Sequence, residues 1–181
     1  MEYFSEQDFR ENASLYFLTE MISPDKSAVN APLTTNYDVF LSYNIADLKV
    51  VRGIYYALKQ EGLKVYLDVI VDPTLDRNST DKRTAEIIHT RLEHSKSIIY
   101  AESPNARKSN WMPWEIGVVD GRKGKCMVMP ISNDNGEIPT KREYLLLYPT
   151  IHPSGTNKVP QVVQEGNNHR IISQTRLSSF I

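Results

Sequence analysis

The chain has 181 residues, a formal charge of −1 at pH 7, and hydrophobic and charged fractions of 40% and 24%. These values are ordinary for one folded domain with a short appendage, and they exclude a disordered chain and a coiled coil. The near-zero charge also argues against a nucleic-acid binder or an anionic-membrane binder, since either would need a basic excess.

The compartment is indicated by cysteine usage and by the N-terminus. The single cysteine, Cys126, cannot form an intrachain disulfide, which favours a reducing environment. No apolar run approaches the about 20 residues of a membrane span, and the acidic N-terminus has no signal-peptide-like apolar region. We therefore expect a cytoplasmic protein that binds neither membranes nor nucleic acid.

Residues 1–36 are predicted to form a helix and a linker outside the main domain. Ser5 is a suitable N-cap for a helix that runs to Met21, because acidic residues follow it in the first turn. Residues 23–36 are rich in turn-forming residues, as linkers are. We favour packing of the helix on the main domain; the alternative is an arm that binds a partner or a second copy.

Alternating strands and helices are predicted between residues 37 and 151. Strands are expected at 37–43, 63–68, 97–103, 125–131 and 144–151, and helices at 46–61, 81–94 and 110–121. The helices repeat apolar residues every three or four positions, and Gly62 stands where a C-cap glycine belongs. The strands are nearly continuous apolar runs, as in sheets covered on both faces. With right-handed crossovers, this pattern predicts a flavodoxin-like α/β domain of three layers, whose parallel five-stranded sheet has the order 2-1-3-4-5.

Two segments of this part of the chain are less regular. A long polar loop is expected at 69–80, directly after the second strand. Residues 152–181 are expected to be a C-terminal extension that packs on the domain. Within this extension, the sequence PQVVQ is compatible with an extra strand and the last ten residues with a short helix.

The predicted fold also predicts where a ligand binds. Open α/β sheets bind ligands beyond the carboxyl ends of their strands where the strand order reverses, here between the first and third strands. The residues at these ends are Ser42, Tyr43 and Asn44 after the first strand, Glu102 and Ser103 after the third, and Asp68 after the second.

The segment SPNARKSNWMPWE, residues 103–115, carries both tryptophans and a carboxylate toward this crevice. Ser109 or Asn110 can cap the following helix, so Glu115 lies in its opening turns, where the helix dipole favours a carboxylate. Trp111 stands four residues before Glu115 and therefore shares its face. The alternative is that Glu115 only satisfies the dipole and that the tryptophans belong to the core.

Other site classes find no support in the sequence. The four histidines lack the spacing of zinc ligands and there is no second cysteine, so no metal site is expected. The phosphate-binding GxxxxGK[ST] and GxGxxG patterns do not occur, and neither does the GxSxG pattern of α/β-hydrolases.

Taken together, these motifs resemble a Toll/interleukin-1 receptor (TIR) domain, and more closely the bacterial stand-alone type involved in antiphage defence. The resemblance covers residues 37–151. The matching sequences are YDVFLSY (37–43), VYLD (65–68), LDRN (75–78) and a block that ends in SPNARKSNWMPWEIG (103–117). Many TIR domains have a glycine in the loop after the second strand, whereas residues 69–80 have none.

The resemblance implies one of two functions. Some TIR domains are scaffolds that act by self-association, and others cleave NAD+ at the nicotinamide–ribose bond to give nicotinamide plus ADP-ribose or a cyclic isomer. In the enzymes an essential carboxylate lies on the helix after the third strand, where Glu115 stands here. The resemblance further implies NAD+ as substrate with no resident cofactor, a homo-oligomer formed through TIR–TIR contacts, and a separate effector protein that responds to the product in bacterial antiviral immunity.

The chemistry of such a site is consistent with the residues. Cleavage of an N-glycosidic bond builds positive charge on the ribose, which a fixed carboxylate stabilises. Trp111 can stack on a flat cationic ring. The expected substrate-binding residues are Ser42, Tyr43, Asn44, Asp68, Arg77, Ser103 and Trp111, with Arg77 as a phosphate contact. Besides the scaffold, a nucleoside N-glycosyl transferase remains an alternative.

Overall fold

The computed structural model describes residues 2–22, 28–77, 81–122, 124–139, 142–165 and 170–181. The strands are β1 (Phe4–Ser5), β2 (Tyr37–Ser42), β3 (Val65–Tyr66), β4 (Ser95–Glu102), β5 (Lys125–Ser132), β6 (Thr150–Ser154), β7 (Val159–Glu165) and β8 (Ile171–Arg176). The α-helices are α1 (Glu6–Ile22), α2 (Leu48–Gln60), α3 (Asp68–Val71), α4 (Lys82–Glu93), α5 (Trp111–Gly121) and α6 (Leu177–Phe180). Short 3-10 turns lie at Ile45–Asp47, Ala106–Lys108 and Glu143–Leu147.

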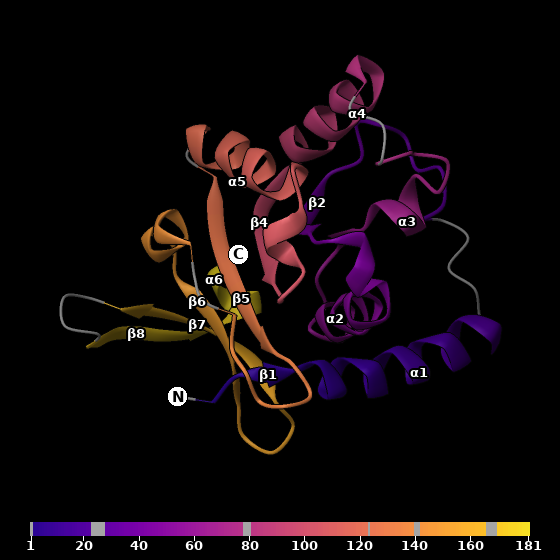
Figure 1. Cartoon of the computed structure of the whole chain (residues 1–181). Coiled ribbons are helices and arrows are strands. Elements are labelled where there is room, and N and C mark those ends of the chain that lie inside the picture. Colours follow the sequence, from indigo (N-terminus) through magenta and orange to yellow (C-terminus); the bar gives the residue numbers. More distant parts are fainter. Residues whose placement is uncertain (1, 23–27, 78–80, 123, 140–141, 166–169) are drawn as a thin grey trace.

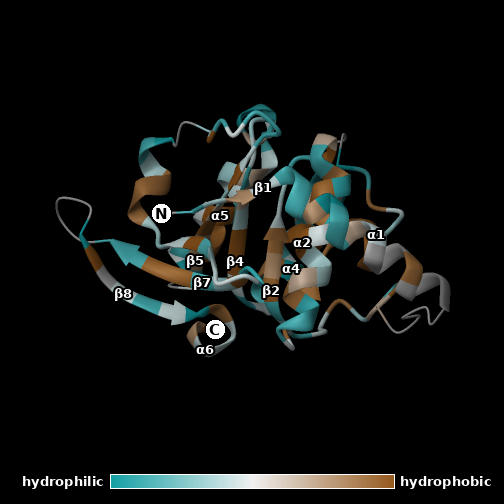
Figure 2. Cartoon of the chain, turned by 90° about the horizontal axis from the view of Figure 1, so that it is seen from below, coloured by the Kyte–Doolittle hydropathy of each residue, from teal (hydrophilic) through white to brown (hydrophobic). Residues whose placement is uncertain are grey.

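The predicted parallel sheet is confirmed. Its described strands follow the order β3-β2-β4-β5-β6-β7-β8, and the neighbours from β3 to β6 pair in parallel. This part is the order 2-1-3-4-5 expected from the sequence. Helices α1 and α2 cover one face, and α4 and α5 cover the other (Figure 1). The apolar strands between them form the centre of the molecule, as the hydropathy colours show (Figure 2).

Two hydrophobic clusters fill the space on the two faces of the sheet. Alternate residues of a strand point to opposite faces, so Val39 and Leu41 join the cluster beneath α2, while Phe40 joins the one beneath α4 and α5. All three side chains are buried, which explains why β2 reads as a continuous apolar run. After α2, Gly62 adopts a φ of 79° and Gly62 N donates to Lys59 O at 3.0 Å, which confirms it as the C-cap glycine.

The expected fifth strand at 144–151 is partly wrong. The apolar residues 144–147 belong to the 3-10 turn Glu143–Leu147, and the strand, β6, begins only at Thr150. Leu145 is buried, whereas Leu146 and Leu147 are 64% and 77% exposed. A 3-10 turn brings every third residue to the same side, so only one leucine of the three reaches the core. A short apolar run does not reveal this difference, because strands contain the same residue types.

The expected loop at 69–80 begins with a helix instead. Residues Asp68–Val71 form α3, and the buried side chain of Val71 anchors it to the cluster beneath α4 and α5. Asp72, directly after α3, forms an ion pair with the buried Arg91 at 2.8 Å. Residues 78–80, the end of the expected loop, lie outside the described residues.

The C-terminal extension continues the sheet. β7 contains the sequence PQVVQ, which confirms the extra strand, and it pairs antiparallel with β6. The last ten residues form a helix only at Leu177–Phe180, because Ile171–Arg176 pair with β7 as β8. The division of the chain at residues 36 and 151 remains a prediction.

The N-terminal helix packs on the main domain. Ser5 Oγ accepts a hydrogen bond from Asp8 N at 3.2 Å and Asp8 Oδ2 accepts from Ser5 N at 2.9 Å, so Ser5 caps α1 as predicted. α1 runs across α2, and the two come so close that a Cβ at Gly53 would lie 1.8 Å from Phe9 O. Residues 23–27 of the expected linker lie outside the described residues.

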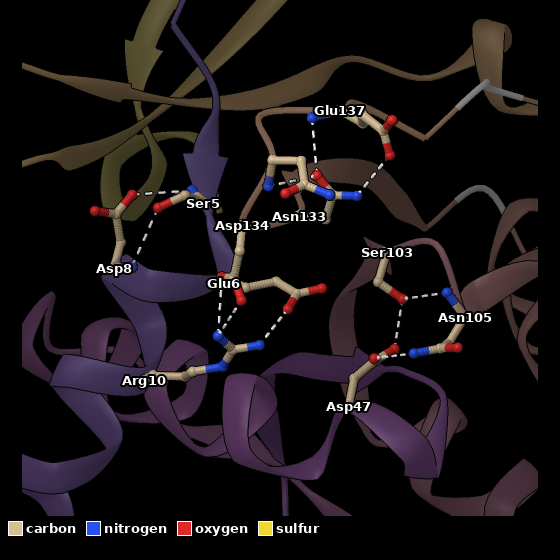
Figure 3. A network of polar contacts seen from close by, with 11 residues as sticks. Ser5, Glu6, Asp8, Arg10, Asp47, Ser103, Asn105, Asn133, Asp134 and Glu137 are labelled. Atoms are coloured by element: carbon tan, nitrogen blue, oxygen red, sulfur yellow. Dashed lines mark hydrogen bonds and ion pairs between the residues drawn. The ribbon is translucent and has the colours of Figure 1, made fainter.

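The sequence did not predict that the first residues join the sheet. β1 pairs in parallel with the end of β5, where Phe4 stands beside Ile131. Beside this strand, Arg10 of α1 binds Asp134 at 2.7 Å and Glu6 at 2.5 Å (Figure 3).

Of the helices described, none has both the length and the hydrophobicity that a membrane crossing requires.

Candidate functional site

The carboxyl ends of the parallel strands bring four predicted site residues together. Ser42 ends β2, Asp68 follows β3 as the first residue of α3, and Arg77 follows α3 along the chain. Glu115 reaches the same place from the second turn of α5. This helix is capped by Ser109, whose hydroxyl oxygen accepts a hydrogen bond from Met112 N at 3.2 Å.

Glu115 lies at the centre of this network and its exposed fraction is 0%. The Ser42 hydroxyl donates to its Oε2 at 2.5 Å, and Arg77 Nη1 donates to its Oε1 at 2.6 Å. Burial raises the pKa of Glu115, while Arg77 and Ser42 oppose this shift because they favour the ionised form. Glu115 is therefore a desolvated carboxylate held by two donors.

Arg77 connects the two carboxylates of the site. Its Nε forms an ion pair with Asp68, and its Nη1 forms one with Glu115. The guanidinium carbon also lies 6.0 Å from the ring centre of Phe40 and 5.8 Å from that of Tyr43. Burial disfavours the charged form, but the carboxylates outweigh it and raise the pKa of Arg77, so its charge persists.

Asp68 is held in place by groups around it. Its Oδ1 accepts from the Tyr43 hydroxyl and from Val69 N, each at 2.7 Å. Burial and the neighbouring Asp68 raise the pKa of Tyr43 well above its ordinary value, so the phenol remains a neutral donor. In this arrangement Asp68 orients Arg77.

A pocket of about 240 Å³ opens beside the network. It is lined by Tyr43, Asn44, Ile45, Arg77, Lys108, Ser109, Asn110 and Trp111. Arg77 lines this pocket and also forms the ion pair with Glu115, so it links the pocket to the carboxylate. Trp111 is fixed here by its indole Nε1, which donates to Arg77 O at 2.8 Å.

The expectation that both tryptophans reach the crevice is correct only for Trp111. Trp114 is 38% exposed, and its ring faces that of His89 on α4 at a centroid distance of 6.5 Å. The two indoles meet edge to face at 5.6 Å. Three residues separate them on the helix, so Trp114 extends the same surface toward α4 and away from the pocket.

Ser103 belongs to a second network, in which Asp47 is the central acceptor (Figure 3). The Ser103 hydroxyl donates to Asp47 Oδ2 and accepts from the backbone N–H groups of Asn105 and Ala106 at 3.1 Å. Asn105 Nδ2 donates to Asp47 Oδ1 at 2.7 Å, and Asn44 Nδ2 donates to Asn105 O at 3.0 Å. Ser103 thus fixes the loop that carries part of the pocket wall.

A family model described as TIR domain matches residues 39–155. The chain belongs to the TIR domain family. The "Probable 3' cyclic ADP-D-ribose synthase ThsB'" of Bacillus cereus (strain MSX-D12) is 38% identical over 116 residues, which cover 64% of this chain and 60% of that relative. The "Putative cyclic ADP-D-ribose synthase TIR2" of Cytobacillus dafuensis is 27% identical over 116 residues, covering 56% of this chain and 31% of that relative. The chain therefore spans less than two thirds of either relative.

Among solved structures, a similar one is the TIR domain of the Toll-related receptor TRR-2 from Hydra magnipapillata. It shares 23% sequence identity and a TM-score of 0.40, over 51% of this chain and 69% of that one.

Three residues at this site of the TIR domain were not predicted from the sequence. Asp47 is 7% exposed and Lys108 and Ile45 line the pocket. An acidic residue at the start of the predicted helix at 46–61 was a detectable signal, since Asp and Asn commonly occupy the first positions of helices. Nothing in the sequence pattern marked Lys108, because a lysine in a polar loop is usually solvated.

Within the described ranges, no three His, Cys, Asp or Glu residues gather so as to hold a metal ion. Cys126 is buried in β5, and burial raises the pKa of its thiol to about 12, which leaves it protonated and unreactive.

Proposed function

We propose that this TIR domain cleaves the nicotinamide–ribose bond of NAD+ and gives nicotinamide plus ADP-ribose or a cyclic ADP-ribose isomer. The observation that carries the proposal is Glu115, a fully buried carboxylate held by Ser42 and Arg77 next to a pocket. The printed names of two relatives, both cyclic ADP-D-ribose synthases, support the same reaction class.

The reaction balances without a general acid. The bond between ribose C1′ and the pyridinium nitrogen breaks, its electron pair goes to that nitrogen, and nicotinamide leaves as a neutral molecule. The ribose becomes oxocarbenium-like, and the carboxylate of Glu115 stabilises the positive charge. Water then adds at C1′ to give ADP-ribose, or a nucleophile of the same molecule adds to give the cyclic isomer, and a proton is released to solvent when that nucleophile is water or a hydroxyl.

The other site residues bind and orient in this proposal. Trp111 offers its ring to the nicotinamide from the pocket wall, Tyr43 and Asn44 face the ribose and phosphates, and Arg77 contacts a phosphate. Ser42 orients Glu115, and Asp68 orients Arg77. Ser103 fixes the loop through Asp47 and acts as a positioning residue. NAD+ is the substrate, and no resident cofactor is needed.

The biological setting belongs to the same proposal. A cytoplasmic TIR homo-oligomer makes the product, and a separate effector protein responds to it as a signal in bacterial antiviral defence. This step rests on the family and on the names of the relatives.

The test is to incubate concentrated protein with NAD+ and identify the products by mass spectrometry. Wild type and the control Glu143→Gln, which changes an exposed glutamate outside the pocket lining, should release nicotinamide, and Glu115→Gln should not. Product masses distinguish ADP-ribose from a cyclic isomer, which is lighter by one water. Equal nicotinamide release by folded Glu115→Gln would overturn the role of Glu115, and a protein that acts only as a scaffold would release none in any variant.

A further inference from the structure

Glu115 is inaccessible in this structure, although the proposed reaction needs it at the ribose. Both of its oxygens are occupied, Oε2 by the Ser42 hydroxyl and Oε1 by Arg77 Nη1. Ser42 sits within the central strand β2 and is fully buried, so it is fixed by the sheet. Arg77 follows α3 and lines the pocket, and its side chain retains 12% exposure. Of the two groups that hold Glu115, Arg77 is therefore the one that borders open space.

The pocket beside Arg77 has the character of an anion site. Its lining includes two cations, Arg77 and Lys108, and contains no carboxylate among the described residues. Lys108 Nζ donates a hydrogen bond to the neutral amide oxygen of Asn105 at 3.3 Å. Arg77 Nη2 is buried and lacks an acceptor within the described parts of the chain. A lining that holds a lysine, an unused guanidinium donor and no carboxylate favours a ligand with several anionic oxygens.

The size of the pocket limits which part of a ligand it can hold. A volume of about 240 Å³ falls below the roughly 300–1,000 Å³ of pockets that enclose a whole small ligand. It therefore fits one portion of a dinucleotide. The portion that matches two cations is the diphosphate, because arginine binds phosphate oxygens through two parallel hydrogen bonds.

We propose that a diphosphate bound in this pocket takes the Arg77 guanidinium away from Glu115 and thereby uncovers the catalytic carboxylate. The identity of the ligand as the diphosphate of NAD+ rests on the function proposed above. Nη1 and Nη2 then donate to phosphate oxygens, and Oε1 of Glu115 becomes free to face the ribose. Nε keeps its ion pair with Asp68, which Tyr43 and Val69 N hold in place, so the guanidinium turns about a fixed point.

This exchange has a consequence that binding alone can test. In the wild type, the anion competes with Glu115 for Arg77. In Glu115→Gln the competing charge is gone, so the anion should bind more tightly.

The experiment measures inorganic pyrophosphate binding by isothermal titration calorimetry on the full chain. Relative to wild type, Glu115→Gln should bind pyrophosphate about tenfold more tightly and Arg77→Ala at least about tenfold more weakly, as expected for charge-assisted hydrogen bonds. Lys108→Ala should also weaken binding. Arg83→Ala, which removes an exposed arginine on α4, should leave it unchanged.

The outcomes separate the inference from the proposed function. Equal pyrophosphate affinity in wild type and Glu115→Gln would overturn the exchange, even if NAD+ is cleaved. Tighter binding in Glu115→Gln together with no nicotinamide release would support the exchange and overturn the function. If Arg77→Ala does not fold, as judged by near-ultraviolet circular dichroism, the comparison of Glu115→Gln with Lys108→Ala and Arg83→Ala still decides the inference.

Discussion

The indole Nε1 of Trp111 donates a hydrogen bond to the main-chain carbonyl of Arg77 at 2.8 Å. This contact joins the first residue of α5 to the segment after α3, and these two segments also share the pocket wall. The tryptophan therefore has two separable effects: its ring borders the pocket, and its N–H fixes the backbone of the residue that covers Glu115.

Substitutions of the tryptophans should separate these effects. Trp111→Ala should reduce nicotinamide release more than Trp114→Ala, because only Trp111 lines the pocket. Trp111→Phe keeps an aromatic ring but loses the donor, and we expect an intermediate loss. The measurement is the steady-state rate of nicotinamide release, with kcat and KM determined separately. Equal losses in Trp111→Ala and Trp114→Ala would count against a stacking role for Trp111.

Removal of the Ser42 hydroxyl should shift the pH dependence of the reaction. The hydrogen bond from Ser42 favours the ionised form of Glu115, so Ser42→Ala should raise the pKa of that carboxyl further. Because the reaction needs the ionised form, activity should be lost at a higher pH on acidification than in the wild type. We also expect the rate to fall about 10- to 100-fold, as for other hydrogen bonds to charged groups.

A second buried strand serine provides the control. Ser97 on β4 is also 0% exposed, and its hydroxyl donates to Asp38 O at 2.7 Å rather than to Glu115. Ser97→Ala should lower the free energy of unfolding by about as much as Ser42→Ala does. It should leave the acid limb of the pH–rate profile where it lies in the wild type. An unchanged acid limb in Ser42→Ala would show that Glu115 ionisation does not control the rate.

A methyl group at Gly53 should separate α1 from α2. The added Cβ would lie 1.8 Å from the Phe9 carbonyl oxygen, and backbone must move to relieve that contact. We expect Gly53→Ala to destabilise the protein by about 1–3 kcal/mol, measured by urea denaturation. Gly117→Ala on the exposed side of α5 meets nothing within 4 Å and should stabilise by about 0.5–1 kcal/mol. Equal stability of wild type and Gly53→Ala would mean that α1 does not pack on α2 in solution.

The elements that the sequence predicted correctly are those whose residues carry their own local signal. The residues of β2 around Phe40 point alternately to two buried faces, which is typical of an inner strand, so the sheet order was predictable. A serine cap precedes α5, so the position of Glu115 in its opening turns was predictable as well. Asp68 and Ser42 followed from the rule that the carboxyl ends of parallel strands meet at one edge.

What the sequence did not reveal depends on contacts between distant residues. Arg77 stands in a segment whose conformation is set by Asp68, Glu115 and Trp111, each from a different element, so its role as a cover over the carboxylate has no local signature. The role of Asp47 also has no local signature, since its hydrogen-bond partners lie 56 and 58 residues further along the chain. The sequence of β8, IISQTR, does not alternate polar and apolar residues, so the strand follows only from its pairing with β7.

The pairing of β1 with β5 bears on how the protein can be shortened. The family match runs from residue 39 to residue 155, yet Phe4, Phe9 and Leu177 share one hydrophobic cluster with the central strands. A version cut at the limits of the match would begin inside β2, lose the helix that covers α2, and leave β6 as a bare edge able to pair with other molecules. The residues matched by the family model are thus fewer than those that pack into one folded unit. If a fragment of residues 39–155 aggregates, the cause would be the loss of these packed segments and not a property of the intact protein.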